Sequence, residues 1–202
     1  MITEPTLITM GIALFTLTNP IGTSPVFLAL TQSKTVKQQR HIALIAGLGV
    51  FVVLLASLLI GTYVLAWFDI DVTSFKIAGF AFVAMIAWGM LTKQGSPVAA
   101  TDGSPAIVPL AFPVLAGPGA IALMVSFSHD HSTLEDYAWG VAIVAIVAIL
   151  TTVVLYLAPL LMKVLGEQGM SVFTKVFGLI LLAICVQAVL SALITAFPVL
   201  GG

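Results

Sequence analysis

The sequence predicts an all-α membrane protein with six transmembrane helices, arranged as two inverted three-helix repeats in which the first and fourth helices are broken. Three observations lead to this fold class. Of the 202 residues, 60% are hydrophobic and 7% are charged, whereas a soluble domain has about a quarter charged residues. Six apolar segments are long enough to cross a hydrocarbon core of about 30 Å. The first and fourth segments also share one spacing of prolines.

The six predicted spans form one transmembrane domain over residues 1–202, with the repeats at about 1–100 and 101–202. The first span is too long for one straight helix, as a broken or re-entrant helix would be. The N-terminus lacks the basic region of a signal peptide, so we expect this span to be retained. Four prolines make the fourth span the least regular. The spans lie near residues 5–30, 41–67, 73–92, 105–128, 137–163 and 172–197.

The charges predict the orientation of the chain. Six spans place both termini on one side of the membrane, and six of the seven basic residues fall on the other side. The positive-inside rule makes that other side cytoplasmic, so both termini should lie outside the cytoplasm. The net charge of −1 suggests no nucleic-acid partner. The basic residues on the predicted cytoplasmic side are Lys34, Lys37, Arg40, Lys93, Lys163 and Lys175.

Two pairs of prolines indicate an internal repeat. Residues 19–25 read Asn-Pro-Ile-Gly-Thr-Ser-Pro, and residues 112–118 read Phe-Pro-Val-Leu-Ala-Gly-Pro, an offset of 93 positions. A weaker match relates residues 76–80 to residues 175–179, with an offset of 99. Three spans in each half would invert the second half relative to the first. This is the plan of many secondary transporters, whose binding sites lie near the midplane between the repeats.

A proline breaks a helix because it has no N–H and clashes with the carbonyl four residues back. In hydrocarbon, each unsatisfied backbone group costs several kcal/mol, so the broken backbone must be shielded by protein or line a wet cavity. The N–H groups after a break favour a carboxylate, and the freed carbonyls suit an ammonium group. Two breaks could therefore hold both ends of a zwitterion.

The candidate substrate site consists of small, uncharged residues at both breaks. Asn19 and the freed carbonyls would hold the ammonium group, and backbone N–H groups would hold the carboxylate. Glycines allow close approach of the ligand to the backbone. The alternative is that the prolines only kink packed helices and the glycines only let helices approach. The candidate residues are Thr18, Asn19, Pro20, Gly22, Thr23, Ser24, Pro25, Ala116, Gly117, Pro118 and Gly119.

The sequence suggests no enzyme, cofactor or metal site. It contains no P-loop, no HExxH motif and no plausible Ser/His/Asp set, and we interpret residues 129–131 (His-Asp-His) as a solvated loop. No acid or base is evident within the spans, so coupling to H⁺ or Na⁺ stays open. Gln187 should hydrogen bond to a neighbouring helix. Thr151 and Thr152 should bond across helices or to their own backbone.

Residues 19–27 resemble the "NPIG-x-x-P-x-F" signature of MarC-type inner-membrane proteins, and residues 109–121 resemble the second signature of that family, "PLA-x-P-x-x-AGPG-A-I". Residues 165–169 and 178–181 are also similar to its loop and sixth span. The resemblance implies six spans in a bacterial or archaeal inner membrane. Some members are described as transporters of small neutral amino acids such as glycine and alanine. Thr23 departs from the family, which usually has Asn there, and this puts the substrate preference in question.

The function we expect is secondary transport of small neutral amino acids by alternating access, within the lipid bilayer. Two alternatives remain: a channel or exporter for another small polar solute, and a membrane scaffold that transports nothing. An enzyme is the least expected class. The sequence leaves the oligomeric state open.

Overall fold

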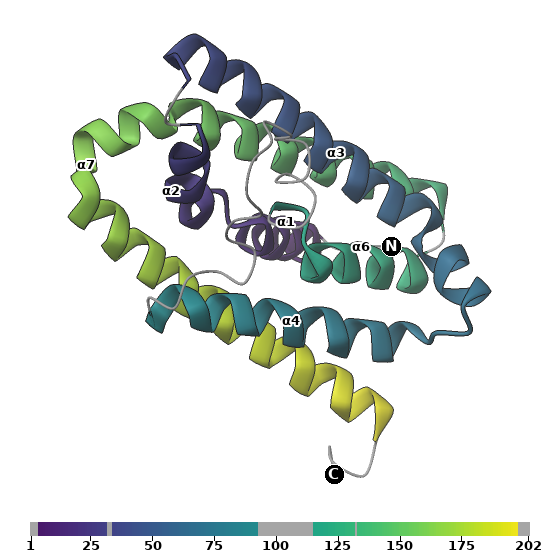
Figure 1. Ribbon diagram of the computed structural model, residues 1–202. Helices are drawn as coiled ribbons and strands as arrows, with labels where there is room; N and C mark the ends of the chain where they lie inside the picture. Colours follow the sequence, from purple (N-terminus) through teal and green to yellow (C-terminus); the bar gives the residue numbers. More distant parts are fainter. Residues whose placement is uncertain (1–3, 32–33, 93–114, 132, 198–202) are drawn as a thin grey trace.

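The computed structural model describes residues 4–31, 34–92, 115–131 and 133–197, and within these ranges the chain is all-helical, as predicted. Figure 1 shows the arrangement of the helices. They are α1 (Glu4–Thr18), α2 (Pro20–Leu30), α3 (Val36–Trp67), α4 (Val72–Thr92), α6 (Pro118–Asp130) and α7 (Leu134–Ala196).

Five helical stretches in the described part of the chain are long and apolar enough to cross a membrane. They coincide with the first, second, third, fifth and sixth predicted spans. The 13 residues of α6 reach only about 20 Å, and residues 93–114, which include the first ten residues of the predicted fourth span, lie outside the described residues. The count of six spans therefore stays a prediction. The five stretches are Leu7–Ser24, Val36–Trp67, Val72–Thr92, Leu134–Gly166 and Ser171–Ala196.

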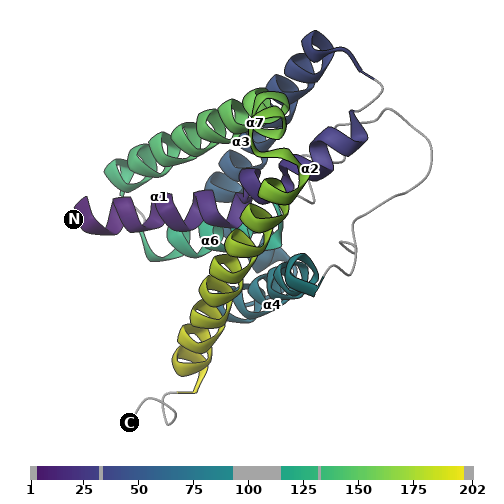
Figure 2. The ribbon, with the colours of Figure 1, turned by 90° about the vertical axis from the view of Figure 1, so that its left-hand side faces the viewer.

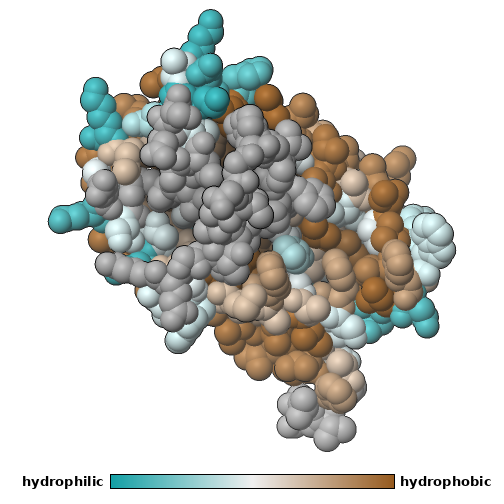
Figure 3. Space-filling model, viewed as in Figure 1, coloured by the Kyte–Doolittle hydropathy of each residue, from teal (hydrophilic) through white to brown (hydrophobic). Residues whose placement is uncertain are grey.

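The surface agrees with a position in the membrane. Hydrophilic residues gather at two opposite ends of the molecule, and a hydrophobic surface lies between them (Figure 3). Large apolar side chains such as Leu48, Ile60 and Ile149 are more than half exposed. α1 begins and α7 ends at the same end of the molecule (Figures 1 and 2).

α7 comprises two helices joined at a sharp bend. Gly166 has φ 63° and ψ −179° inside the run of 63 helical residues, a conformation open essentially to glycine alone. The first half (Leu134–Gly166) and the second half (Ser171–Ala196) are separate candidate spans, and Figure 1 shows them diverging from the bend. The chain therefore passes from the fifth predicted span to the sixth with almost no loop.

Side-chain caps fix where the long helices begin. Thr35 and Gln38 form a reciprocal capping box at the start of α3, and Thr133 and Asp136 form another at the start of α7. Such boxes satisfy N–H groups that a helix start otherwise leaves unpaired. At the start of α4, the Asp71 carboxylate accepts a hydrogen bond of 2.9 Å from the Ser74 N–H.

Small residues allow the long helices to pack closely. α3 packs on the first half of α7, where any side chain at Gly47 would overlap Thr152. α4 packs on α6 and on α7; a Cβ added to Gly178, in the second half of α7, would lie 3.1 Å from Met90 Cβ. α1 lies between the first half of α7 and α6 (Figure 2). This arrangement places the end of α1 and the start of α6 inside the molecule.

Candidate functional site

The first break lies at Asn19, between α1 and α2, where the sequence predicts it. Asn19 has φ 42° and ψ 53°, the left-handed region that Asn tolerates better than most residues. Pro20 is the first residue of α2, where its missing N–H has no cost. The Asn19 Oδ1 accepts a hydrogen bond of 3.2 Å from the Gly22 N–H, and Nδ2 donates to the Met90 Sδ of α4 at 3.4 Å. The break is thus capped by its own side chain and held against α4.

Pro25 does not interrupt the chain a second time, because α2 continues from Pro20 to Leu30. The predicted hydroxyls around it bond to their own helices. Thr23 Oγ1 donates to the Asn19 carbonyl at 2.9 Å, and Ser24 Oγ donates to the Pro20 carbonyl at 2.7 Å. Thr18 Oγ1 donates in the same way to the carbonyl of Phe15, at 2.9 Å. With their protons engaged, these hydroxyls retain oxygen lone pairs, so the first break offers a ligand acceptors more than donors.

The second break lies at Gly117, directly before α6. Gly117 is extended, with φ −70° and ψ 172°, and Pro118 follows as the first helical residue. No side chain among the described residues caps this helix start, and Gly117, Gly119 and Ala120 are all buried. An uncapped start leaves N–H groups without intrahelical partners and has roughly half a positive charge. The two breaks therefore differ, since the first is capped and rich in acceptors and the second is uncapped and rich in donors.

α4 contacts both breaks. A Cβ added to Gly119 would lie 2.7 Å from Val83 Cγ2 of α4 and 3.3 Å from Leu17 Cδ2 of α1. A Cβ on Gly22 would lie 2.6 Å from the Cε of Met90, which is seven residues further along α4. The structure thus brings the end of α1 against the start of α6 and connects both breaks through one helix.

Most of the candidate site residues are buried at these two breaks: Thr18, Asn19, Pro20, Gly22, Ser24, Ala116, Gly117 and Gly119. Thr23 and Pro118 are half-buried, and the side chain of Pro25 lies outside what the structure describes. Sequence reasoning missed Leu17, Val83 and Met90, which surround the breaks. These residues are apolar, like most residues of the spans, so the sequence contains no signal that distinguishes them.

The polar residues in the long spans follow the predictions in part. Thr152 Oγ1 donates to the carbonyl of Ala148 at 2.7 Å, as expected. Thr151 is fully buried, and its hydroxyl has no hydrogen-bond partner in the described part of the chain. Gln187 is exposed on α7, and the hydrogen bond predicted for it is not found among the described residues. In the same part of the chain, no three His, Cys, Asp or Glu side chains lie together so as to hold a metal ion.

A polar vestibule of about 470 Å³ lies between α1, α4 and α6. Lys76 Nζ donates to Ser126 Oγ at 3.4 Å inside it. The His131 ring is in hydrogen-bond contact with the Phe127 carbonyl at 3.2 Å and stacks on the Phe127 ring. The vestibule is lined by Thr9, Met10, Ala13, Lys76, Leu123, Ser126, Phe127, Asp130 and His131.

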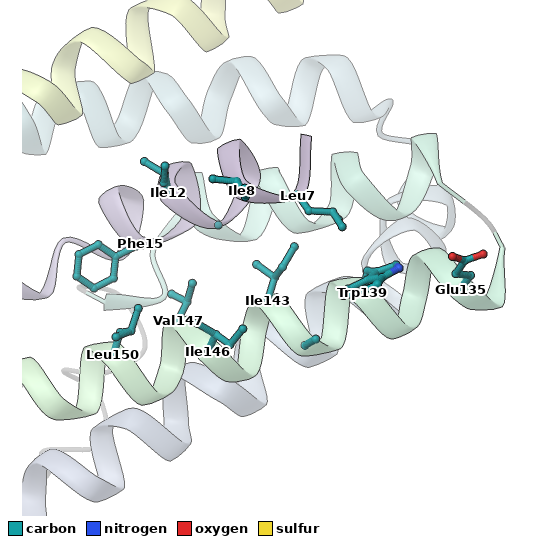
Figure 4. A pocket seen from close by; sticks show the side chains of 12 residues that line it. Leu7, Ile8, Ile12, Phe15, Glu135, Trp139, Ile143, Ile146, Val147 and Leu150 are labelled. Atoms are coloured by element: carbon teal, nitrogen blue, oxygen red, sulfur yellow. The ribbon is translucent and has the colours of Figure 1, made fainter. Parts of the chain in front are cut away.

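An apolar groove of about 610 Å³ lies between α1 and the first half of α7. Side chains such as Ile12, Ile143 and Leu150 line it along its length, and Glu135 and Trp139 lie at one end (Figure 4). Burying the charged ends of an amino acid there would cost several kcal/mol, because most of the lining offers no hydrogen-bond partner. The groove suits hydrocarbon, whereas the vestibule and the breaks suit a polar solute.

Comparison with known proteins identifies relatives along nearly the whole chain. A family model described as "MarC family integral membrane protein" matches residues 5–197. The UPF0056 membrane protein YvbG of Bacillus subtilis is 33% identical, over 94% of this chain and 94% of its own length. The UPF0056 membrane protein YhcE of Escherichia coli is 34% identical, over 93% of this chain and 91% of its own.

An archaeal relative, the UPF0056 membrane protein PH0760 of Pyrococcus horikoshii, is 30% identical over 92% of this chain and 93% of its own length. No solved structure matches the chain.

Proposed function

Because the chain belongs to the MarC family of integral membrane proteins, we propose that it is a secondary transporter for small neutral amino acids. The substrates would be of the size of glycine and alanine and would cross the inner membrane by alternating access. The coupling ion would be H⁺ or Na⁺. This goes beyond the family membership, which establishes a multi-pass membrane protein with relatives in bacteria and archaea.

The observation that supports the proposal most is the pair of buried helix starts, each with proline as its first residue. The uncapped start of α6 suits a carboxylate, because its free N–H groups and helix dipole favour negative charge. The first break suits an ammonium group through Asn19 Oδ1 and the oxygens of Thr23 and Ser24. A zwitterion between the breaks would need no charged side chain, which agrees with the uncharged residues found there.

The spacing of structural landmarks supports two repeats. Pro118 follows Pro20 by 98 positions, and the capping box at Thr133 follows the one at Thr35 by 98. We propose this register in place of the offset of 93 inferred from the proline pairs, because Pro20 and Pro118 each begin a described helix. In our proposal the repeats are inverted, and alternating access moves one repeat against the other.

Two further landmarks have nearly the same spacing. Gly178 follows Gly79 by 99 positions, and each packs a helix closely against a neighbour. Positive φ angles occur at Asp69 and at Gly166, which are 97 positions apart and connect the second and third spans of each half. The proposed repeat thus includes the breaks, the helix starts and the connections.

The direct test is uptake of labelled glycine and alanine by purified protein in proteoliposomes. Gly117→Leu should abolish uptake, because Gly117 is buried directly before α6 and a large side chain there would occupy the proposed site. The φ and ψ angles of Gly117 are ones that any residue adopts, so the substitution should not strain the backbone. Gly11→Leu is the matched control, since a Cβ at Gly11 meets only Ile143, at 3.9 Å. Normal uptake by Gly117→Leu would contradict the site.

Counterflow and thermal-unfolding measurements distinguish a carrier from the two alternatives, a channel or exporter and a scaffold that transports nothing. A carrier shows trans-stimulation by substrate on the far side, and a channel does not. A scaffold would show no thermal shift with any amino acid in a panel. Absence of both uptake and thermal shift in the wild-type protein would contradict the proposed function as a whole.

A further inference from the structure

The polar vestibule and the second break lie along one seam of three helices. Ala13 lines the vestibule, and Leu17 is one turn further along α1. On α4, Val83 follows Lys76 by seven residues. On α6, Gly119 precedes Ser126 by seven residues. Spacings of four and seven residues keep the members of each pair on one face of their helix.

The deep end of this seam is closed by apolar side chains. Leu17 and Val83 are each 5% exposed, and both lie against Gly119, as the distances from an added Cβ show. Seven helical residues correspond to about 10 Å, so Lys76 lies roughly that far from the level of Val83. The start of α6 is thus covered by Leu17 and Val83, and α4 also packs closely on the Pro118 carbonyl at Gly79.

The ionic groups of the vestibule are available to a ligand. Among the described residues, no carboxylate lies within ion-pair distance of Lys76, whose only hydrogen bond there is the one to Ser126 Oγ. Asp130 is exposed and likewise has no cationic partner in the described part of the chain. His131 is engaged with Phe127. One ammonium and one carboxylate therefore line the same cavity without neutralising each other.

We propose that this vestibule is the docking site for an amino acid zwitterion on the side predicted to face outward, and that Leu17 and Val83 form the gate to the second break. The substrate carboxylate binds Lys76 and Ser126, and its ammonium group faces Asp130. The inference rests on the proposed transport function, whose substrate class it shares. It gives a role to Lys76, the one basic residue that the charge pattern places on the outer side.

Transport kinetics test the role of Lys76. Lys76→Gln should raise the KM for glycine entering from the vestibule side by about tenfold or more, because it removes a charge-assisted hydrogen bond. The maximal rate should stay the same, and Lys76→Arg should keep most of the affinity. Lys175→Gln is the matched control, since Lys175 is exposed on the second half of α7 and outside the vestibule. An unchanged KM in Lys76→Gln would overturn the proposal.

A second measurement does not depend on transport. Ser126→Cys should react with a membrane-impermeant thiosulfonate, and glycine should slow the reaction, whereas glycinamide, which has no carboxylate, should not. The wild-type chain provides the background, because its only cysteine, Cys185, is fully buried and does not line the vestibule, as Ser126 does. Protection by glycine without any uptake would support the vestibule and contradict the transport function. Uptake without protection would support transport and contradict the vestibule.

Discussion

Asn19 combines a backbone conformation that ends α1 with a side chain that begins α2. Its left-handed φ and ψ turn the chain, its Oδ1 caps Gly22, and its Nδ2 contacts Met90. A residue with a Cβ and no short polar side chain would lose the cap and would strain the backbone by about 1–2 kcal/mol. Asn is therefore suited to this position for structural reasons, whether or not a ligand contacts it.

Two substitutions at Asn19 distinguish its structural role at the break from a role in ligand binding. Asn19→Ala should reduce the free energy of unfolding by about 2–3 kcal/mol, through the lost cap and the strained φ. Asn19→Gly should cost only a few tenths of a kcal/mol, because glycine adopts this conformation and is a fair cap. If the amide binds substrate, the Gly variant should still lose glycine uptake. Equal stability of both variants in thermal unfolding would contradict this account of the break.

Individual residues also show where sequence reasoning ends. The positions of the breaks follow from Pro20 and Pro118, because the chemistry of proline leaves few alternatives. The hydroxyls of Thr23 and Ser24 were expected to face a ligand, and their protons are instead bonded to their own helix. A short hydroxyl in a helix can reach the carbonyl one turn back, so its orientation depends on local geometry that the sequence does not reveal.

At the scale of the helices, polar first turns extend the spans beyond their apolar segments. α3 begins at Val36, five residues before the predicted start, because Thr35 and Gln38 form a capping box there. α7 similarly begins at Leu134, three residues before the predicted start. Hydropathy locates only the part of a helix that lies in the hydrocarbon. The helix ends are set by hydrogen bonds outside it.

The start of α4 makes stability sensitive to acid. The hydrogen bonds from Ser74 hold the pKa of Asp71 below its ordinary value of 3.8. Because the pKa of Asp71 is lower in the folded state, the ionised carboxylate stabilises the fold. Its contribution to the free energy of unfolding is complete above the unfolded pKa and is lost as the pH falls through the folded pKa. Asp71→Asn should remove this pH-dependent contribution to stability, and Ser74→Ala should weaken it. Thermal unfolding between neutral and strongly acidic pH measures both, and an unchanged acid profile in Asp71→Asn would contradict the role of this cap.

The bend in α7 predicts opposite effects at two glycines. Gly166→Ala should destabilise the protein by about 1–3 kcal/mol, purely through backbone strain, since nothing lies within 4 Å of an added Cβ. Gly11→Ala should stabilise it by about 0.5–1 kcal/mol, because Gly11 is helical and its surroundings can hold a methyl group. Unfolding in detergent compares the two. If Gly166→Ala leaves the free energy of unfolding unchanged, the bend does not need the positive φ angle of Gly166.

For the whole molecule, composition was enough to predict an all-α membrane protein, and five of its predicted spans coincide with candidate spans in the structure. The packing between them was not predictable in the same way. Gly47 and Gly79 allow close approach to Thr152 and Pro118, yet glycine in an apolar span does not indicate its partner. The two prolines that begin described helices, Pro20 and Pro118, are 98 positions apart, whereas the offset of 93 read from the sequence pairs Pro25 with Pro118.

The charge asymmetry gives a prediction for the orientation of the molecule. A reporter enzyme that is active only in the cytoplasm should be silent when fused after the last residue, because both termini are predicted to lie outside. The same reporter fused at Lys34, between the first two spans, should be active and serves as the control. Activity of the C-terminal fusion would reverse the predicted orientation and would place the vestibule on the cytoplasmic side.

Because α7 bends at Gly166, its second half can pivot about this residue as a rigid arm. The second half of α7 has 26 residues, which corresponds to a rigid arm of about 39 Å. A rotation of about 10° at Gly166 would therefore swing the far end of that arm through roughly 7 Å, somewhat more than the rise of one helical turn, about 5.4 Å. Since α4 packs along this arm and contacts both breaks, a small torsional change at one glycine is mechanically sufficient to shift the helix that connects the two halves of the candidate site.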